Sequence, residues 1–183
     1  MSEGIIVRYC SPTLAGLKTG SLFSCPYRRR SDVISFLRKW NINLKSKGIR
    51  LIPLKINDGK ALIYVYRPSR LKSDLSSNEV CSLLCERGYC VDNCEKCIAG
   101  LMKRLCESAD FPHEIGLFLG YPLEDVKGFI ENKAENSKLV GCWKVYGDEK
   151  EAQKTFEKYR KCKQIYQKQW AGGKPLTKLA VAR

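Results

Sequence analysis

The chain has 183 residues, a formal net charge of +14 from 33 Lys and Arg against 19 Asp and Glu, and ten cysteines. Its longest apolar runs, residues 61–66 and 115–119, are far shorter than the roughly 20 residues of a membrane-spanning helix, and its start lacks the pattern of a signal peptide. We therefore expect a cytoplasmic protein with no membrane partner and with reduced cysteines. No run rich in Pro, Gly or Ser divides the chain, so one domain over residues 1–183 is expected.

The positive charge is concentrated toward the two ends of the sequence. Residues 1–73 carry 15 basic and 3 acidic side chains, residues 74–136 carry 6 and 12, and residues 137–183 carry 12 and 4. This distribution attracts anionic partners at long range, so an acidic protein or a nucleic acid is expected to bind. Solubility alone explains the charge equally well.

The chain opens with a β-branched run, GIIVRY over residues 4–9, which predicts a strand. The strand would lead into a turn at Cys10, where Ser11 suits an N-cap and Pro12 the first helical position. Glycines at positions 16 and 20 would weaken the short helix that follows.

A second helix is predicted to begin at Ser31 or Asp32 and to end at Gly48. Five apolar side chains within it fall at i, i+3, i+4, i+7 and i+11, namely Val33, Phe36, Leu37, Trp40 and Leu44. Residues 49–56 and 60–67 flank an Asn-Asp-Gly turn, which predicts a β-hairpin. Because Pro53 cannot donate to a ladder, its strand is expected at an edge or a bulge.

Helical periodicity returns between residues 73 and 108, where one helix is predicted before Gly88 and a second after it. Their apolar faces carry Val80, Cys81, Leu84 and Cys85 on the first and Cys94, Cys97, Ile98, Leu101 and Leu105 on the second.

Residues 110–130 are expected to form two short helices joined by a tight corner at the centre of the fold. Asp110 would cap the first helix and Pro112 would lie in its opening turn. Gly120 would end it and Pro122 would open the second.

A strand is predicted over residues 139–146, and the longest helix is predicted to start at Asp148. Its expected apolar stripe consists of Ala152, Phe156, Tyr159, Cys162, Ile165, Tyr166 and Trp170. After Gly172 and Gly173, residues 176–181 add a last short element. The whole order predicts an α+β fold with about four mostly antiparallel strands covered by helices.

Three stretches resemble the signatures of a bacterial family known as domain of unknown function 3793. They are CSPTLAGLKTGSLF (residues 10–23), FPHEIGLFLGYPLEDVKGFI (residues 111–130) and GCWKVYGD (residues 141–148). The resemblance implies one domain in a bacterial cytosol and brings no activity, substrate or cofactor with it.

The first candidate site is built on Cys10. At the start of a helix its thiolate would be stabilised by free N–H groups, with His113 as base and Glu114 beside it. The neighbouring polar side chains of Ser11, Thr13 and Lys18 would contact a cofactor. The alternative is that Cys10 is a small apolar core residue and His113 a hydrogen-bonded residue at a helix start.

The second candidate is a metal site made by Cys81, Cys85, Cys94 and Cys97, with Cys90 and Cys106 nearby. On two adjacent antiparallel helices these thiolates would suit zinc or an iron–sulfur cluster. Their spacing is not that of paired zinc knuckles and they coincide with the apolar helix faces, so packing is the alternative explanation.

The sequence therefore favours a thiol-dependent redox or metal-handling protein that docks an acidic partner. A non-enzymatic basic module for nucleic acid or an acidic protein is the competing hypothesis, because basic residues alternate with aromatic ones at positions such as Tyr27–Arg30 and Trp143–Lys144.

Overall fold

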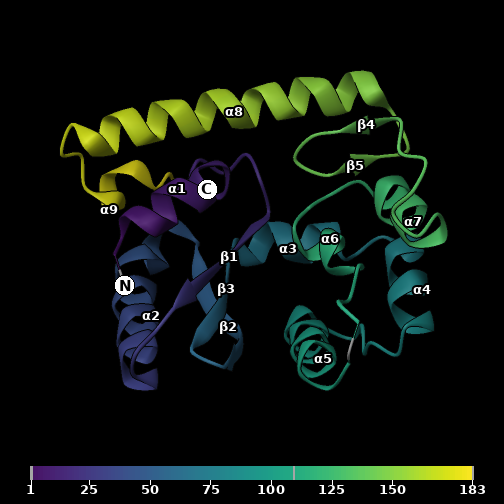
Figure 1. The fold of residues 1–183 in the computed structure, drawn as a ribbon, viewed down its shortest axis with the longest axis horizontal. Coiled ribbons are helices and arrows are strands. Elements are labelled where there is room, and N and C mark those ends of the chain that lie inside the picture. The colour runs from purple at the N-terminus through teal and green to yellow at the C-terminus, as the bar shows by residue number, and fades with distance from the viewer. Residues whose placement is uncertain (1, 109, 183) are drawn as a thin grey trace. The chain divides into compact units, whose positions relative to one another are not determined.

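A computed structural model describes residues 2–108 and 110–182. Contacts within the chain gather into two compact units (Figure 1): unit 1 comprises residues 1–71 and 162–183, and unit 2 comprises residues 72–161. Helices and antiparallel sheets occur together, which confirms the predicted α+β class. The prediction of one domain stays a prediction.

Unit 1 combines helices with a three-stranded antiparallel sheet. Its elements are α1 (Gly4–Leu14), β1 (Gly20–Pro26), α2 (Arg30–Leu44), the 3-10 turn η1 (Lys45–Lys47), β2 (Arg50–Asn57), β3 (Lys60–Tyr66) and α9 (Leu176–Leu179). Helix α3 (Pro68–Asp74) carries the chain from unit 1 into unit 2.

The predicted strand over residues 4–9 is wrong, because these residues begin helix α1. Ile6, Val7, Cys10 and Leu14 are fully or almost fully buried, at i, i+1, i+4 and i+8, which is the spacing of one helix face. Ser11 does not cap a helix but lies inside α1, where its buried hydroxyl donates to the carbonyl of Val7. The short apolar run therefore follows the period of a helix.

The sheet has the strand order β1–β3–β2, so the predicted hairpin is confirmed and β2 is an edge strand. Asp58 and Gly59 have φ of 48° and 72°, as a two-residue hairpin turn of type I′ requires. The register shifts between Pro53 and Lys55, which confirms the expected bulge. Strand β1 was not predicted, and it pairs along β3 from Gly20↔Tyr66 to Pro26↔Lys60.

The core of unit 1 lies between the sheet and its helices. All five apolar side chains predicted for the second helix are buried on α2, and its C-terminal 3-10 turn ends at Gly48 with a φ of 65°. Leu176, Leu179 and Ala180 complete the core. The predicted last element is thus confirmed as α9.

Arg67 is the largest fully buried side chain of unit 1 and ties its segments together. Its guanidinium donates to the carbonyls of Thr13 (2.7 Å), Leu14 (2.7 Å), Lys47 (3.0 Å) and Val181 (2.8 Å). Because these carbonyls belong to three separate segments, one side chain fixes the end of α1, the turn after α2 and the segment after α9.

Unit 2 is mostly helical. Its elements are α4 (Asn78–Glu86), α5 (Cys94–Glu107), α6 (Ile115–Phe118), α7 (Leu123–Glu131), β4 (Leu139–Val140), β5 (Lys144–Val145) and the first half of α8 (Glu149–Ala171). The residues predicted as one strand, 139–146, instead form a small hairpin of β4 and β5, because the chain turns at Gly141 and Cys142.

The predicted corner is confirmed as the α6–α7 pair, with Gly120 at a φ of 75° and Pro122 as the N-cap of α7. Its first helix begins later than predicted. Asp110 does not cap it, because Glu114 holds the N-cap position of α6.

Asp148 caps the long helix α8 as predicted, accepting from the backbone N–H groups of Lys150 and Glu151. The expected continuous apolar stripe is only partly buried: Ala152 and Cys162 are buried, whereas Ile165 and Trp170 are exposed. Among the described residues, no helix has both the length and the apolar composition to cross a membrane.

Candidate functional site

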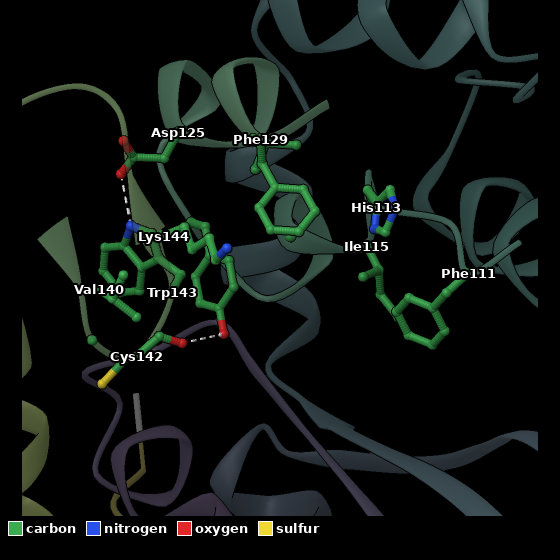
Figure 2. A pocket seen from close by; sticks show the side chains of 13 residues that line it. Phe111, His113, Ile115, Asp125, Phe129, Val140, Cys142, Trp143 and Lys144 are labelled. Atoms are coloured by element: carbon green, nitrogen blue, oxygen red, sulfur yellow. Dashed lines mark hydrogen bonds between the residues drawn. The ribbon is translucent and has the colours of Figure 1, made fainter. Parts of the chain in front are cut away.

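Unit 2 contains an open cavity of about 440 Å³ between the α6–α7 corner and the β4–β5 hairpin (Figure 2). The lining side chains are mostly apolar and several are aromatic. They are Phe111, His113, Ile115, Gly116, Tyr121, Asp125, Val126, Phe129, Val140, Gly141, Cys142, Trp143 and Lys144. Ligand cavities of about 300–1,000 Å³ with few polar groups are typical of sites for small organic molecules.

Asp125, in the first turn of α7, fixes the aromatic wall of this cavity. Its buried carboxylate accepts the indole N–H of Trp143 at 2.7 Å, drawn as a dashed line in Figure 2. It also accepts the backbone N–H groups of Tyr146 (2.7 Å) and Gly147 (2.8 Å). Since these donors engage both carboxylate oxygens, Asp125 holds the hairpin in place and has little hydrogen-bonding capacity left for a ligand.

Trp143 is held by aromatic neighbours as well as by Asp125. Its ring stacks on Tyr121 with 4.7 Å between centroids and meets Phe156 edge-on at 4.6 Å. A Cβ at Gly141 would lie 2.1 Å from the ring of Phe156, so only glycine permits this approach of the hairpin to α8. Packing on several sides gives the wall a defined shape before any ligand arrives.

Gly128 has the same role on α7. A Cβ there would lie 2.4 Å from Cγ of Tyr146, so the hairpin ring rests directly on the helix backbone. Tyr146 in turn donates from its hydroxyl to the carbonyl of Glu135 at 2.9 Å. The packing of Tyr146 against α7 therefore depends on a glycine–tyrosine contact that the sequence pattern alone does not reveal.

His113 and Lys144 are the basic side chains of the cavity. The exposed imidazole of His113 packs against Phe129 with 4.9 Å between ring centroids. Within residues 2–108 and 110–182 its ring nitrogens make no hydrogen bond. Lys144 donates to the carbonyl of Ala134 at 2.6 Å. In the view of Figure 2, His113 and Trp143 lie on opposite sides of Phe129.

Glu114, which was predicted to assist a reactive thiol, is buried and connects helices of unit 2 through a hydrogen bond and ion pairs. Its Oε1 accepts the hydroxyl proton of Tyr89 at 2.8 Å and lies 2.8 Å from Nε of Arg104. Its Oε2 lies 3.7 Å from a terminal guanidinium nitrogen of Arg87. Burial first, and then the hydrogen bond and charge of Glu114, raise the pKa of Tyr89. The cluster links the start of α6 to α5 and to the end of α4.

Cys10 lies in the middle of α1 rather than at a helix start, and it is fully buried. Burial raises the pKa of its thiol far above the ordinary value, against a smaller opposing effect of the Lys18 charge. A reactive cysteine needs access and a lowered pKa, so these features favour the packing alternative. The predicted meeting with His113 stays a prediction, because Cys10 belongs to unit 1 and His113 to unit 2.

The hydroxyls predicted to contact a cofactor are engaged inside unit 1. Thr13 shares a 2.8 Å hydrogen bond with the hydroxyl of Ser21, and Ser11 bonds within α1. Both side chains are fully buried. Lys18 is half-buried beyond the end of the helix.

The cysteines predicted as metal ligands come from α4 and from the first turn of α5, and Cys90 lies in the connection between these helices. Burial first, and then the charges of Cys94, Cys81, Cys90 and Cys85, raise the pKa of Cys97 to about 11, so these thiols lie near one another. The thiol of Cys97 also lies 3.3 Å from the carbonyl of Cys90. In the part of the chain that the structure describes, no three His, Cys, Asp or Glu side chains are arranged to hold a metal ion.

Sequence reasoning missed the cavity and the role of Asp125. A usable signal was present. The segments around residues 111–130 and 140–146 combine aromatic side chains with glycines, which permit close ring-to-backbone contacts. The pairing of those two segments in space is what the pattern could not supply.

A family model described as protein of unknown function (DUF3793) matches residues 6–180 of the chain. Comparison with curated proteins and with solved structures found no match.

Proposed function

Because the chain belongs to a family of proteins of unknown function, DUF3793, its role has to be inferred from its own residues, and we propose that unit 2 binds a small organic molecule with a planar apolar body. The observation that carries the proposal is the cavity of about 440 Å³ beside Trp143. Its aromatic walls favour flat apolar groups, since ring faces pack over a large area at little entropic cost.

The distribution of polar groups in the cavity supports this class of ligand. Asp125 is occupied by three N–H donors, and the amine of Lys144 already donates to a backbone carbonyl. His113 supplies an exposed imidazole at one side. A ligand with an apolar body and one hydrogen-bonding group directed toward His113 would satisfy both features.

The family resemblance supports the same site. All lining residues except Val140 come from the segments 111–130 and 141–148, two of the three stretches that resemble the family signatures. Two of the stretches that resemble the family therefore supply nearly all of the cavity lining.

The test is a titration of the full chain with N-phenyl-1-naphthylamine, a neutral planar probe whose fluorescence rises in apolar sites. A neutral probe is needed because the net charge of +14 would attract an anionic dye to many places. We expect one site per chain. Val140→Glu should weaken binding at least tenfold, because it places a carboxylate in the lining of the apolar cavity, and Val140 is 69% exposed, so the fold tolerates the change.

Ile165→Glu is the matched control, since Ile165 is 53% exposed on α8 and outside the cavity lining. It should bind the probe like the unaltered chain. Probe binding that is absent, or that Val140→Glu leaves unchanged, would show that the cavity is not a ligand site.

A thiol-dependent role in metal handling is a second candidate, favoured by the gathering of thiols around Cys97. Thiolates suit zinc and iron–sulfur clusters. Elemental analysis and a visible spectrum of anaerobically purified protein test it. Stoichiometric zinc or iron that Cys97→Ser loses would support this role, and a colourless metal-free protein would dismiss it without affecting the cavity proposal.

A further inference from the structure

The net positive charge of the protein comes entirely from unit 1. Unit 1 carries 19 Lys and Arg against 3 Asp and Glu, a net charge of +16, whereas unit 2 carries 14 against 16, a net charge of −2. Any long-range attraction to an anionic partner therefore acts on unit 1, and the proposed ligand cavity lies in the nearly neutral unit.

Helix α2 presents an unusual outer face within unit 1. Its inner face is buried in the core beside the sheet (Figure 1), whereas Arg30, Ile34, Arg38 and Ile42 are exposed at four-residue intervals. Residues four apart lie on one side of a helix, so these four make a strip of alternating cationic and aliphatic side chains. Ile34 is 49% exposed and Ile42 is 71% exposed.

The strip has few acidic neighbours. Asp32 is the acidic residue of α2, and it lies 3.1 Å from the guanidinium of Arg29. Exposed basic side chains adjoin both ends of the strip, Arg28 before the helix and Lys45 after it. The outer face of α2 is thus strongly cationic and carries two exposed apolar side chains, Ile34 and Ile42.

We propose that this strip of α2 is a docking surface for an acidic protein whose carboxylates are interspersed with apolar side chains. Complementary charge explains the partner's sign, and the two isoleucines explain its class. Arginine and apolar side chains together are typical of the centres of protein–protein interfaces. A nucleic acid would engage the arginines through phosphates and would leave Ile34 and Ile42 without an apolar partner.

The test uses the full chain and defined probes. One is a synthetic helical peptide of glutamate and leucine, the second has the same glutamates with glutamine in place of leucine, and the third is a 20-base-pair DNA duplex. We expect the glutamate–leucine peptide to bind at least tenfold more tightly than the glutamate–glutamine peptide. Ile34→Ser with Ile42→Ser should abolish that difference, and Arg30→Gln with Arg38→Gln should weaken binding of both peptides.

Ile165→Ser is the control for loss of an exposed aliphatic side chain elsewhere in unit 1, and it should change nothing. Equal affinity for the two peptides, or no effect of the isoleucine substitutions, would overturn the proposal. Tighter binding of the duplex than of either peptide, insensitive to the isoleucine substitutions, would also overturn it and assign unit 1 to nucleic acid. Val140→Glu should leave peptide binding unchanged. The docking proposal and the cavity proposal can therefore be refuted independently of each other.

Discussion

Replacing Asp125 by Asn tests whether the carboxylate holds the aromatic wall of the cavity. Oδ1 accepts the N–H groups of Tyr146 and Gly147, and Oδ2 accepts the indole N–H of Trp143. An asparagine can keep its oxygen on the two backbone donors, but its NH₂ group then faces the indole N–H. One hydrogen bond to a charged acceptor is lost, at a cost of about 1.5–3 kcal/mol. In addition, the NH₂ group of the asparagine and the indole N–H of Trp143, both donors, face each other with no acceptor between them.

We expect Asp125→Asn to lower the free energy of unfolding of unit 2 by about 2–4 kcal/mol. Trp143→Phe removes the indole N–H and therefore the unfavourable contact between two donors. The double variant should therefore be more stable than the sum of the two single costs predicts, by about 1–2 kcal/mol. Urea unfolding followed by far-ultraviolet circular dichroism measures all three variants, and it does not depend on the fluorescence of Trp143.

The reasoning would be refuted if the two costs simply add to within about 0.5 kcal/mol, because residues that share a hydrogen bond are coupled. Tyr121→Phe is a useful control, since its ring still stacks on Trp143 while Asp125 is untouched. It should leave the coupling between the other two residues unchanged.

Three further predictions concern burial. Iodoacetamide should modify the exposed thiols within minutes and Cys10 only after unfolding, as peptide mass mapping would detect; rapid labelling of Cys10 would contradict its placement in the core. Since the pKa of Cys97 is raised from 9.0 to about 11, its stabilising contribution is complete below pH 9 and lost as pH rises toward 11. The urea midpoint should fall over that range, and less so in Cys97→Ala. Arg67→Met should destabilise unit 1 by about 3–5 kcal/mol in urea, because four carbonyls lose their buried donor; a cost below about 1 kcal/mol would exclude this role.

Elements with a long, regular pattern were predictable from the sequence. Five buried positions at helical spacing defined α2, and the Asn-Asp-Gly turn defined the β2–β3 hairpin. Residues 4–9 were assigned to a strand because a short β-branched run fits either period, and only the burial of Cys10 and Leu14 beyond it identifies a helix. Strand β1 escaped detection because its Gly, Ser and Pro obscure the alternation, and its pairing with β3 is remote in sequence.

The assignment of residues 4–9 to a strand also explains why Cys10 was chosen for the first candidate site. Once residues 4–14 form one helix, Cys10 no longer sits at a strand-to-helix junction, and its position one turn after Ile6 directs it into the core. The cavity of unit 2 could not be derived in the same way, because it arises where the hairpin meets the α6–α7 corner. The sequence contained its aromatic and glycine residues but not the contact between the two segments.

The composition of unit 1 from two stretches, residues 1–71 and 162–183, has a consequence for synthesis on the ribosome. Leu176, Leu179 and Ala180 belong to its core, and Arg67 donates to the carbonyl of Val181, so the N-terminal part must wait for residues 176–181 before unit 1 is complete. Unit 2, which is continuous, emerges complete while unit 1 is still unfinished. Until residues 176–181 have been made, the nascent chain thus leaves exposed the part of the unit 1 core that these residues cover, and any chaperone of this protein would act on that unit.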